Sequence, residues 1–94
     1  MYFEWDDKKN KSNIQKHGIS FEVAQYAFKD ENRILTEDEE HSGHEKRYFC
    51  FGKIAEHVIT IRFTYRKNNI RIIGAGYWRI GRRIYEKENN SLHK

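Results

Sequence analysis

The clearest pattern in the chain is a strict alternation of apolar and polar residues in its second half. Residues 57–66 read "HVITIRFTYR", and from position 59 apolar or aromatic residues alternate with Thr or Arg. A period of two sends successive side chains to opposite faces of a strand, so the segment predicts a β-strand with one buried face. One face carries Ile59, Ile61, Phe63 and Tyr65, and the other carries Thr60, Arg62, Thr64 and Arg66.

Further strands are predicted on either side of this segment. Residues 67–69 suit a short hairpin turn in which Asn adopts a positive φ, and "IRIIGAG" at 70–76 suits the returning strand. Residues 2–5 and "RYFCFG" at 47–52 predict two more strands. A brief strand is predicted for "RIL" at 33–35, inside an otherwise solvated acidic loop.

Helical patterns occupy both ends of the chain. Asp6 is suited to cap a helix that ends at His17, where Gly18 is a typical C-terminal stop. Ser20 is suited to cap a second helix with apolar residues at helical spacing: Phe21, Val23, Ala24, Ala27 and Phe28. The segment "RIGRRIYEKEN" predicts a closing helix with three inward residues, Ile80, Ile84 and Tyr85.

These elements predict one α+β domain over residues 1–94, a small antiparallel sheet of three or four strands packed with N-terminal and C-terminal helices. No proline, repeat or low-complexity segment marks a domain boundary. Cys50 is the only cysteine, which excludes an intrachain disulfide, and we expect it to be a small buried residue. The absence of an apolar leader or membrane-length segment predicts a cytoplasmic protein without a membrane partner.

Charge is distributed unevenly along the chain. The totals are 18 basic and 14 acidic residues, a net charge of +4, yet residues 62–83 contain seven Arg or Lys and no acid. Residues 22–46 have a local charge of −5. Like charges on neighbouring strands repel, and an anionic partner would relieve that repulsion. Nucleic acid and an acidic protein would both meet this need, and the pattern alone does not separate them.

Arginines and interleaved aromatic residues favour RNA as that partner. Arg forms bidentate contacts with phosphate, and aromatic rings stack on unpaired bases. We therefore predict an RNA-binding set that comprises Arg62, Arg71, Trp78, Arg82 and Arg83.

RNA cleavage needs no metal, because the 2′-hydroxyl is an internal nucleophile; it needs proton-transfer groups and cations near the phosphate. The candidates for proton transfer are Lys16, His17, His44, Glu45 and Tyr85. His17 has an equally good structural interpretation as a helix C-terminal residue that interacts with the dipole. The "HSGHE" pair at 41–45 lacks the further ligands of a zinc site, so neither a metal nor another cofactor is expected.

Four segments together resemble the BrnT family of bacterial toxins. They are "FEWDDKKNKSNIQKHGISFEVAQYAF", "HEKRYFCFG", "TYRKNNIRIIGAG" and "RRIYEKEN", and the similarity covers residues 2–89. The resemblance implies a RelE-like α+β fold and a type II toxin–antitoxin toxin, a ribonuclease that inhibits translation and growth. It also implies a ribbon–helix–helix, BrnA-like antitoxin that neutralises the toxin, with operator DNA bound only through the antitoxin complex.

The resemblance also implies site residues. The family's functional positions fall on Lys16, His17, Glu45, Arg47 and Arg66. Where family members usually have "RIISAR", this chain has "RIIGAGYWR", so an Arg that would contact the scissile phosphate is replaced by Gly76.

This departure bears on catalysis. Arg79 or Arg82 is predicted to reach the vacated place, with Trp78 adding a stacking surface. The two glycines, Gly74 and Gly76, also suit a strand that bends into the following helix.

Three functions are open on the sequence. The first is a metal-independent endoribonuclease toxin with catalytic residues Lys16, His17, Glu45, Arg66 and Arg79, and RNA contacts that include Arg47. The second is a non-catalytic module that binds RNA, or DNA within a repressor complex. The third is a protein whose basic face binds only an acidic antitoxin segment.

Overall fold

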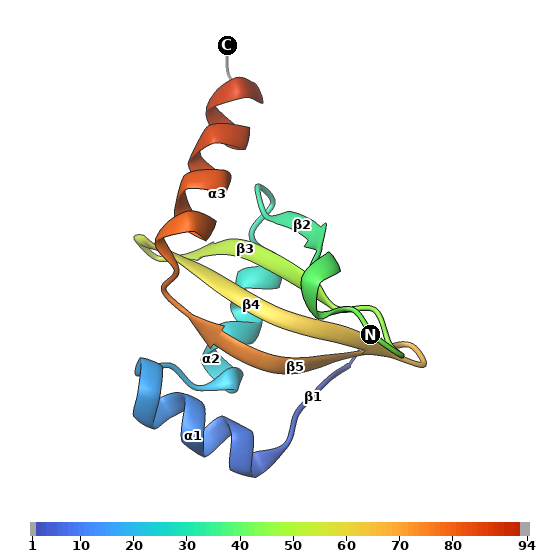
Figure 1. The fold of residues 1–94 in the computed structure, drawn as a ribbon. Coiled ribbons are helices and arrows are strands. Elements are labelled where there is room, and N and C mark those ends of the chain that lie inside the picture. The colour runs from blue at the N-terminus through green and yellow to red at the C-terminus, as the bar shows by residue number, and fades with distance from the viewer. Residues whose placement is uncertain (1, 93–94) are drawn as a thin grey trace.

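A five-stranded sheet forms the centre of the molecule, in the order β1-β5-β4-β3-β2 (Figure 1). The computed structural model describes residues 2–92. Strands β2 to β5 pair antiparallel to one another, whereas β1 lies parallel to β5. The strands are β1 (Phe3–Glu4), β2 (Ile34–Glu37), β3 (Tyr48–Ile54), β4 (His57–Arg66) and β5 (Asn69–Gly76).

The α+β class is confirmed, but the sheet is mixed and larger than predicted. Almost the entire sheet lies between β1 and β5 in the chain, a connection long enough to allow parallel pairing of these two strands. In the β4–β5 turn the positive φ belongs to Lys67, at 56°, and not to an Asn as predicted.

The first helix, α1 (Asp7–His17), has the predicted bounds. The Asp6 carboxylate accepts hydrogen bonds from the backbone N–H groups of Lys8 and Lys9, at 2.8 and 3.2 Å, and these bonds lower the pKa of Asp6. Gly18 ends the helix with φ 73°.

The second helix is shorter than predicted. It comprises α2 (Phe21–Ala24), capped by Ser20 as expected, and then narrows into a 3₁₀ helix, η1 (Gln25–Lys29). Both α2 and η1 cover one face of the sheet, α1 lies along the edge at β5, and the closing helix α3 (Arg79–Leu92) begins on the other face (Figure 1).

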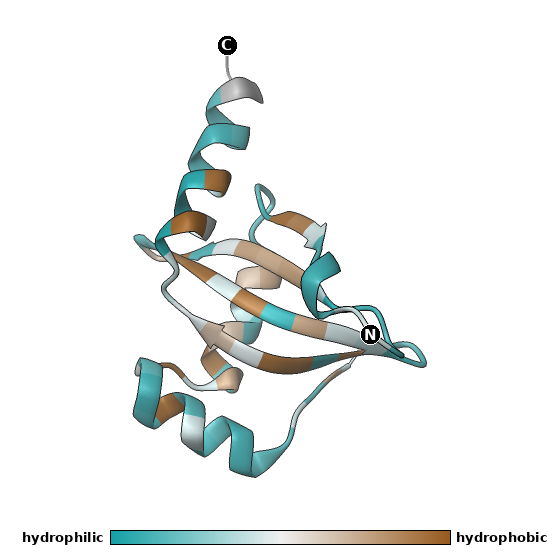
Figure 2. Ribbon diagram, in the orientation of Figure 1, coloured by the Kyte–Doolittle hydropathy of each residue, from teal (hydrophilic) through white to brown (hydrophobic). Residues whose placement is uncertain are grey.

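The main hydrophobic core lies between the sheet and α2–η1. It comprises Ile19, Phe21, Ala24, Ala27, Cys50, Ile59, Ile61, Phe63, Ile70, Ile72 and Ala75. Figure 2 shows the hydrophobic alternation along β4 that builds this layer. A smaller cluster under α3 contains Phe51, Val58 and Tyr85, with Ile34, Phe49 and Ile84 packed against it.

Two sequence predictions about the burial of side chains are wrong. Thr60 and Thr64 were expected on an open face but are buried, because α3 covers Thr60 and the Thr64 hydroxyl donates to the Lys46 carbonyl at 2.7 Å. Ile80 was expected to point inward, yet half of it is exposed, because Gly81, Ile84 and Tyr85 form the face of α3 that packs on the sheet.

The acidic segment is also more ordered than the predicted solvated loop. Asp38 is buried and precedes a short 3₁₀ helix, η2 (Glu39–His41). Its backbone N–H donates to the Arg47 carbonyl at 2.7 Å, and its carboxylate lies 2.9 Å from His41 Nδ1. The loop is thereby attached to the start of β3.

Asp30 joins three elements at the far end of the second cluster. Its carboxylate accepts hydrogen bonds from the Tyr85 hydroxyl at 2.6 Å, the Lys53 N–H at 2.7 Å and the Asn32 N–H at 2.9 Å. Burial and the bond to Asp30 raise the pKa of Tyr85 to about 12. The Tyr85 hydroxyl, a sequence candidate for proton transfer, is thus engaged in a contact that fastens α3 to the body of the fold.

Within residues 2–92, no helix is both long and apolar enough to cross a bilayer.

Candidate active site

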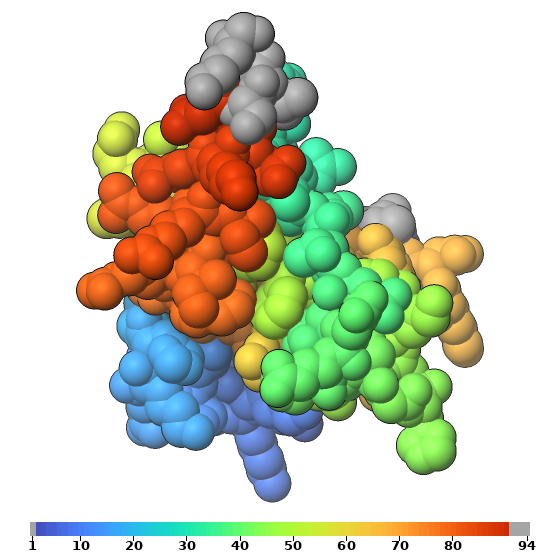
Figure 3. Space-filling view, turned by 45° about the horizontal axis from the view of Figure 1, so that its top comes forward, coloured from blue at the N-terminus to red at the C-terminus, as the bar shows by residue number. Residues whose placement is uncertain are grey.

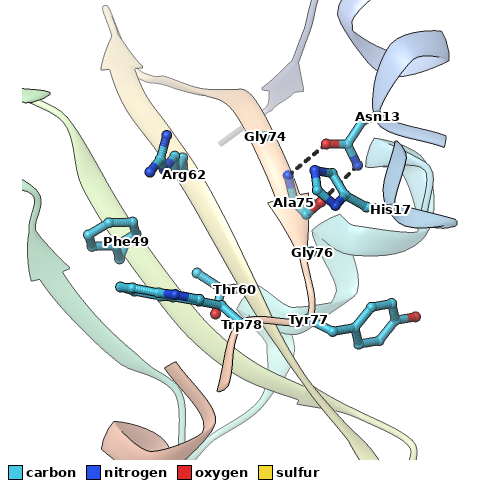
Figure 4. Close-up of a pocket in the computed structure, with 10 residues that line it drawn as sticks. All are labelled: Asn13, His17, Phe49, Thr60, Arg62, Gly74, Ala75, Gly76, Tyr77 and Trp78. Atoms are coloured by element: carbon cyan, nitrogen blue, oxygen red, sulfur yellow. Dashed lines mark hydrogen bonds between the residues drawn. The ribbon is translucent and has the colours of Figure 1, made fainter. Parts of the chain in front are cut away.

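A hollow of about 350 Å³ opens on the α3 side of the sheet, between α1, β5, β4 and the beginning of α3. Figure 3 shows it as a depression bordered by blue α1, the orange start of α3 and the green segment before β3. Figure 4 shows the residues that line it: Asn13, His17, Phe49, Thr60, Arg62, Gly74, Ala75, Gly76, Tyr77 and Trp78.

Two glycines leave the β5 wall of this hollow open. Gly74 pairs with Arg62 and Gly76 with Thr60, so these positions share the α3 side of the sheet. A Cβ at Gly74 would meet no atom within 4 Å, and one at Gly76 would lie 3.5 Å from the His17 ring. The pairing of β5 with β4 continues to Gly76, with a register shift between the Phe63–Ile72 and Arg62–Gly74 pairs. The missing side chains leave space in the hollow.

Asn13 fixes the position of α1 at the edge of β5. Its Nδ2 donates to the carbonyls of Ala75 and Ile19, both at 2.9 Å, and its Oδ1 accepts from the Ala75 N–H at 3.2 Å (Figure 4). The side chain satisfies an edge of β5 that β1 does not reach, since β1 pairs only with residues 70 and 71. Asn13 was not among the site residues predicted from the sequence, although this polar residue is the sole buried position of α1.

One helical turn after Asn13, His17 reaches the hollow. Residues i and i+4 of a helix share a face, so anchoring Asn13 on Ala75 places the imidazole beside Gly76. The His17 side chain is exposed, and no hydrogen bond to it is present in the described part of the chain. Its ring nitrogens are therefore available to a ligand.

Aromatic rings form the opposite wall. Trp78 packs on Phe49 and Phe51 with centroid distances of 5.5 and 6.4 Å, and 41% of its surface stays exposed. The Arg62 guanidinium lies 5.7 Å from the centre of the Phe49 ring, a cation–π contact that holds the charge at the edge of the hollow.

A second hollow, of about 250 Å³, adjoins the first. Tyr77 and Trp78 line both, and Arg79 and Arg82 line the second together with Glu56, His57 and Val58. Trp78 therefore borders two adjoining hollows, each with at least one arginine in its lining. Arg79 and Arg82, predicted to reach the place vacated at Gly76, line the second hollow and not the first.

The fold supplies acids that the basic segment itself lacks. Salt bridges join Arg66 to Glu45 at 3.7 Å, Arg71 to Glu4 at 3.6 Å and Arg82 to Glu86 at 3.4 Å. Part of the repulsion inferred from sequence is thus relieved within the molecule. Among the residues that the structure describes, Arg62, Arg79 and Arg83 have no carboxylate partner.

The predicted catalytic residues do not form one cluster. His17 joins Arg62 and Trp78 in the first hollow, whereas Lys16 is exposed on the last turn of α1. Glu45 lines a separate shallow hollow with Arg47, His41 and His44, and pairs with Arg66. Arg66 is four residues from Arg62 along β4, roughly 13 Å at strand spacing. Arg79 lies near Val58, towards the other end of β4.

Two remaining sequence candidates have a simple structural account. Cys50 is fully buried, and desolvation raises the pKa of its thiol to about 12, as fits the small core residue that was predicted. Across residues 2–92, no three His, Cys, Asp or Glu side chains come together in a group suited to a metal ion.

Comparison with known families gives the decisive finding. Residues 5–80 match the family model described as "Ribonuclease toxin, BrnT, of type II toxin-antitoxin system". The chain belongs to the BrnT family. The resemblance drawn from sequence is confirmed, and the matched region contains every residue that lines the first hollow. No curated protein matches the chain.

Membership of the BrnT family identifies the chain as a ribonuclease toxin of a type II toxin–antitoxin system, which implies an antitoxin partner. In this BrnT protein, the first hollow is where Arg62 and His17 occur together.

Proposed function

We propose that the protein is a metal-independent endoribonuclease that cleaves single-stranded RNA in the hollow between α1 and Trp78. The observation that carries this proposal is the convergence of His17, Arg62 and Trp78, from three separate segments, on one open cavity. They supply an imidazole, an unpaired guanidinium and an aromatic face. Cleavage of cellular RNA would inhibit translation and growth, and a BrnA-like ribbon–helix–helix antitoxin would neutralise the toxin in the cytoplasm.

The chemistry follows from the internal nucleophile of RNA. The 2′-oxygen attacks phosphorus and loses its proton, the bond from phosphorus to the 5′-oxygen breaks, and that oxygen takes up a proton. The products are a 2′,3′-cyclic phosphate and a free 5′-hydroxyl. His17 transfers one of these protons as a general acid or base. Arg62 stabilises the charge that develops on the phosphoryl oxygens.

The other predicted site residues have supporting roles in this proposal. Lys16, beside His17 in sequence, is a second proton-transfer candidate. RNA that extends along β4 would meet Arg66, Glu45 and Arg47, and in the other direction Arg79. Arg71, Arg82 and Arg83 would add attraction for the phosphate backbone. Operator DNA would be bound through the antitoxin complex.

The test is cleavage of a single-stranded RNA by purified, antitoxin-free protein in the presence of a chelator. We expect fragments that end in 2′,3′-cyclic phosphate. His17→Ala and Arg62→Ala should each lose at least about 100-fold in rate, the size typical for a general acid–base group or a charge-stabilising donor. Gln15→Ala, an exposed change on the same helix, is the matched control and should cleave normally. RNA that stays intact, with and without ribosomes, would contradict the proposal.

One observation favours a second function, a non-catalytic RNA-binding module. The sequence departure at Gly74 and Gly76 removes two side chains from the wall of the hollow, and the described residues offer no hydrogen-bond partner that orients His17. Such a module would bind RNA with a steep salt dependence, and its affinity would fall after Arg62→Ala, while no RNA fragment would appear.

A further inference from the structure

We propose that the first hollow seats a single unpaired nucleobase against the exposed face of Trp78. This inference rests on the proposed function and adds to it a subsite that reads a base, next to the phosphate bound by Arg62. Trp78 already packs on Phe49 and Phe51, and these contacts restrict the orientation of the indole. A ring held in advance loses little conformational freedom when a base stacks on it.

The shape of the hollow suits a flat, largely apolar group with a polar edge. Its volume of about 350 Å³ lies at the lower end of the range for small-ligand sites. The absence of side chains at Gly74 and Gly76 allows a planar group to approach the β5 backbone. Opposite Trp78, the rim carries the His17 ring, so a base seated on Trp78 would lie beside the proposed proton-transfer group (Figure 4).

Arginines line both hollows that Trp78 borders. Arg62 lines the hollow that contains the proposed base, and Arg79 and Arg82 line the adjoining one. A single strand that passed from one hollow to the other would meet a guanidinium in each. Proteins that bind single-stranded nucleic acid commonly combine a basic path with an aromatic platform in this way.

A structural role alone accounts poorly for these exposed rings. Tyr77 and Trp78 are consecutive, and 57% and 41% of their surfaces remain exposed beside the cavity. A residue that only covered Phe51 would not need the planar, half-exposed face that Trp78 presents. An apolar side chain of a protein partner would also fit this hollow, and the experiment below includes that outcome.

The experiment uses 2′-deoxy oligonucleotides, which lack the attacking hydroxyl and so report binding without cleavage. One abasic position is moved along a short single strand, and affinity is measured for the full-length protein. In a Trp5→Phe background, Trp78 is the only tryptophan, so its fluorescence reports stacking directly. Thermal unfolding verifies that each variant is folded.

Loss of the stacked base should weaken binding by about 5- to 140-fold at one position of the strand, the range that corresponds to 1–3 kcal/mol per base. Trp78→Leu, which keeps apolar cover over Phe51, should lose the same affinity and become insensitive to the abasic position. Trp78→Phe should retain most of the affinity and most of the sensitivity to the abasic position. Tyr26→Ala removes an exposed ring that does not line the hollow and should change neither.

Three results would overturn the base seat. They are an abasic scan without a sensitive position, equal sensitivity in Trp78→Leu and wild type, and loss of antitoxin affinity in Trp78→Leu with unchanged oligonucleotide binding. The last would assign the hollow to the antitoxin. RNA cleavage is scored separately, so a ribonuclease without a base seat and a base seat without cleavage give different results.

Discussion

Asn13 and Ala75, 62 residues apart in sequence, are joined by a pair of hydrogen bonds that mimics the pairing of a neighbouring strand. The side-chain amide donates to the Ala75 carbonyl and accepts from its N–H, and so attaches α1 to the edge of β5. His17, one turn later, is thereby placed beside Gly76. This link makes α1 part of the candidate active site.

Replacement of Asn13 by Ala should destabilise the protein and impair the site together. The Ala75 N–H and carbonyl and the Ile19 carbonyl would lose their partner, at about 1–3 kcal/mol for each buried group left unsatisfied. Asn13→Asp should be worse, because a carboxylate would face two carbonyl oxygens. Urea denaturation measures the stability, and Gln15→Ala is the exposed control. An Asn13→Ala variant as stable as the control would show that water replaces the amide.

Gly81→Ala tests the contact between α3 and the sheet. The added Cβ would overlap Thr60 Oγ1 and lie 2.8 Å from the Phe51 ring, and both residues are buried. Overpacking of about 1–3 kcal/mol should outweigh the gain of up to about 1 kcal/mol in helix propensity, so the free energy of unfolding should fall.

The matched control for this change is Gly74→Ala, where the new Cβ meets no atom within 4 Å. Its free energy of unfolding should stay unchanged or rise slightly. If Gly81→Ala were as stable as Gly74→Ala, α3 would have to pack less tightly on Thr60 than the structure shows.

Tyr85→Phe isolates the hydrogen bond to Asp30. The ring keeps its packing and only the hydroxyl is lost, so about 1.5–3 kcal/mol of stability should disappear, the range for a bond to a charged acceptor. Thermal or urea unfolding at neutral pH measures the change. If the free energy of unfolding of Tyr85→Phe equalled that of the wild type, water would have to solvate the Asp30 carboxylate as well as the Tyr85 hydroxyl does.

The same pair gives the pH dependence a definite sign. Although burial alone would raise the pKa of Asp30, the hydrogen bonds from Tyr85, Asn32 and Lys53 lower it. The stabilisation is therefore present above the ordinary carboxyl pKa and is lost as the pH falls through the lowered value. At the alkaline end, stability is lost as the pH rises from about 10 towards the Tyr85 pKa of about 12. In Tyr85→Phe, the free energy of unfolding should therefore change less with pH than in the wild type, at both the acidic and the alkaline end.

Comparison of Arg62→Ala with Arg66→Ala decides which end of β4 contacts the scissile phosphate. Arg62 lines the hollow with His17 and has no carboxylate partner in the described chain, whereas Arg66 is paired with Glu45. We expect Arg62→Ala to lower the cleavage rate by about 100-fold or more and Arg66→Ala by less than about tenfold. The reverse order would favour the site predicted from sequence, with Glu45 and Arg66 at its centre.

Local chemistry was enough to predict several elements with their bounds. Asp6 and Gly18 delimit α1 because a cap acts on the N–H and carbonyl groups of its own helix end. The alternation in 57–66 predicted the bounds of β4 and the burial of Ile59, Ile61 and Phe63. The prediction was wrong for Tyr65, which was placed on the same buried face but is 44% exposed. The motifs of the BrnT family are short and contiguous, so they could also be recognised from the sequence.

The candidate site was only partly visible in the sequence. Arg62, Trp78 and His17 were all selected, but as members of a larger set that the fold divides among three places. Their grouping depends on β5 register and on Asn13, and no periodic pattern encodes either. Glu4 and Glu45, which neutralise two arginines of the basic segment, come from distant parts of the chain.

By itself, the sequence determined the α+β class, the caps of α1, the bounds of β4 and the BrnT family. Only the tertiary structure decided that Thr60 is covered, that Tyr85 holds Asp30 and that Asn13 brings His17 to the hollow beside Trp78. The reason is physical: caps and alternation arise between neighbours along the chain, whereas these contacts join residues that only the packing of separate elements brings together.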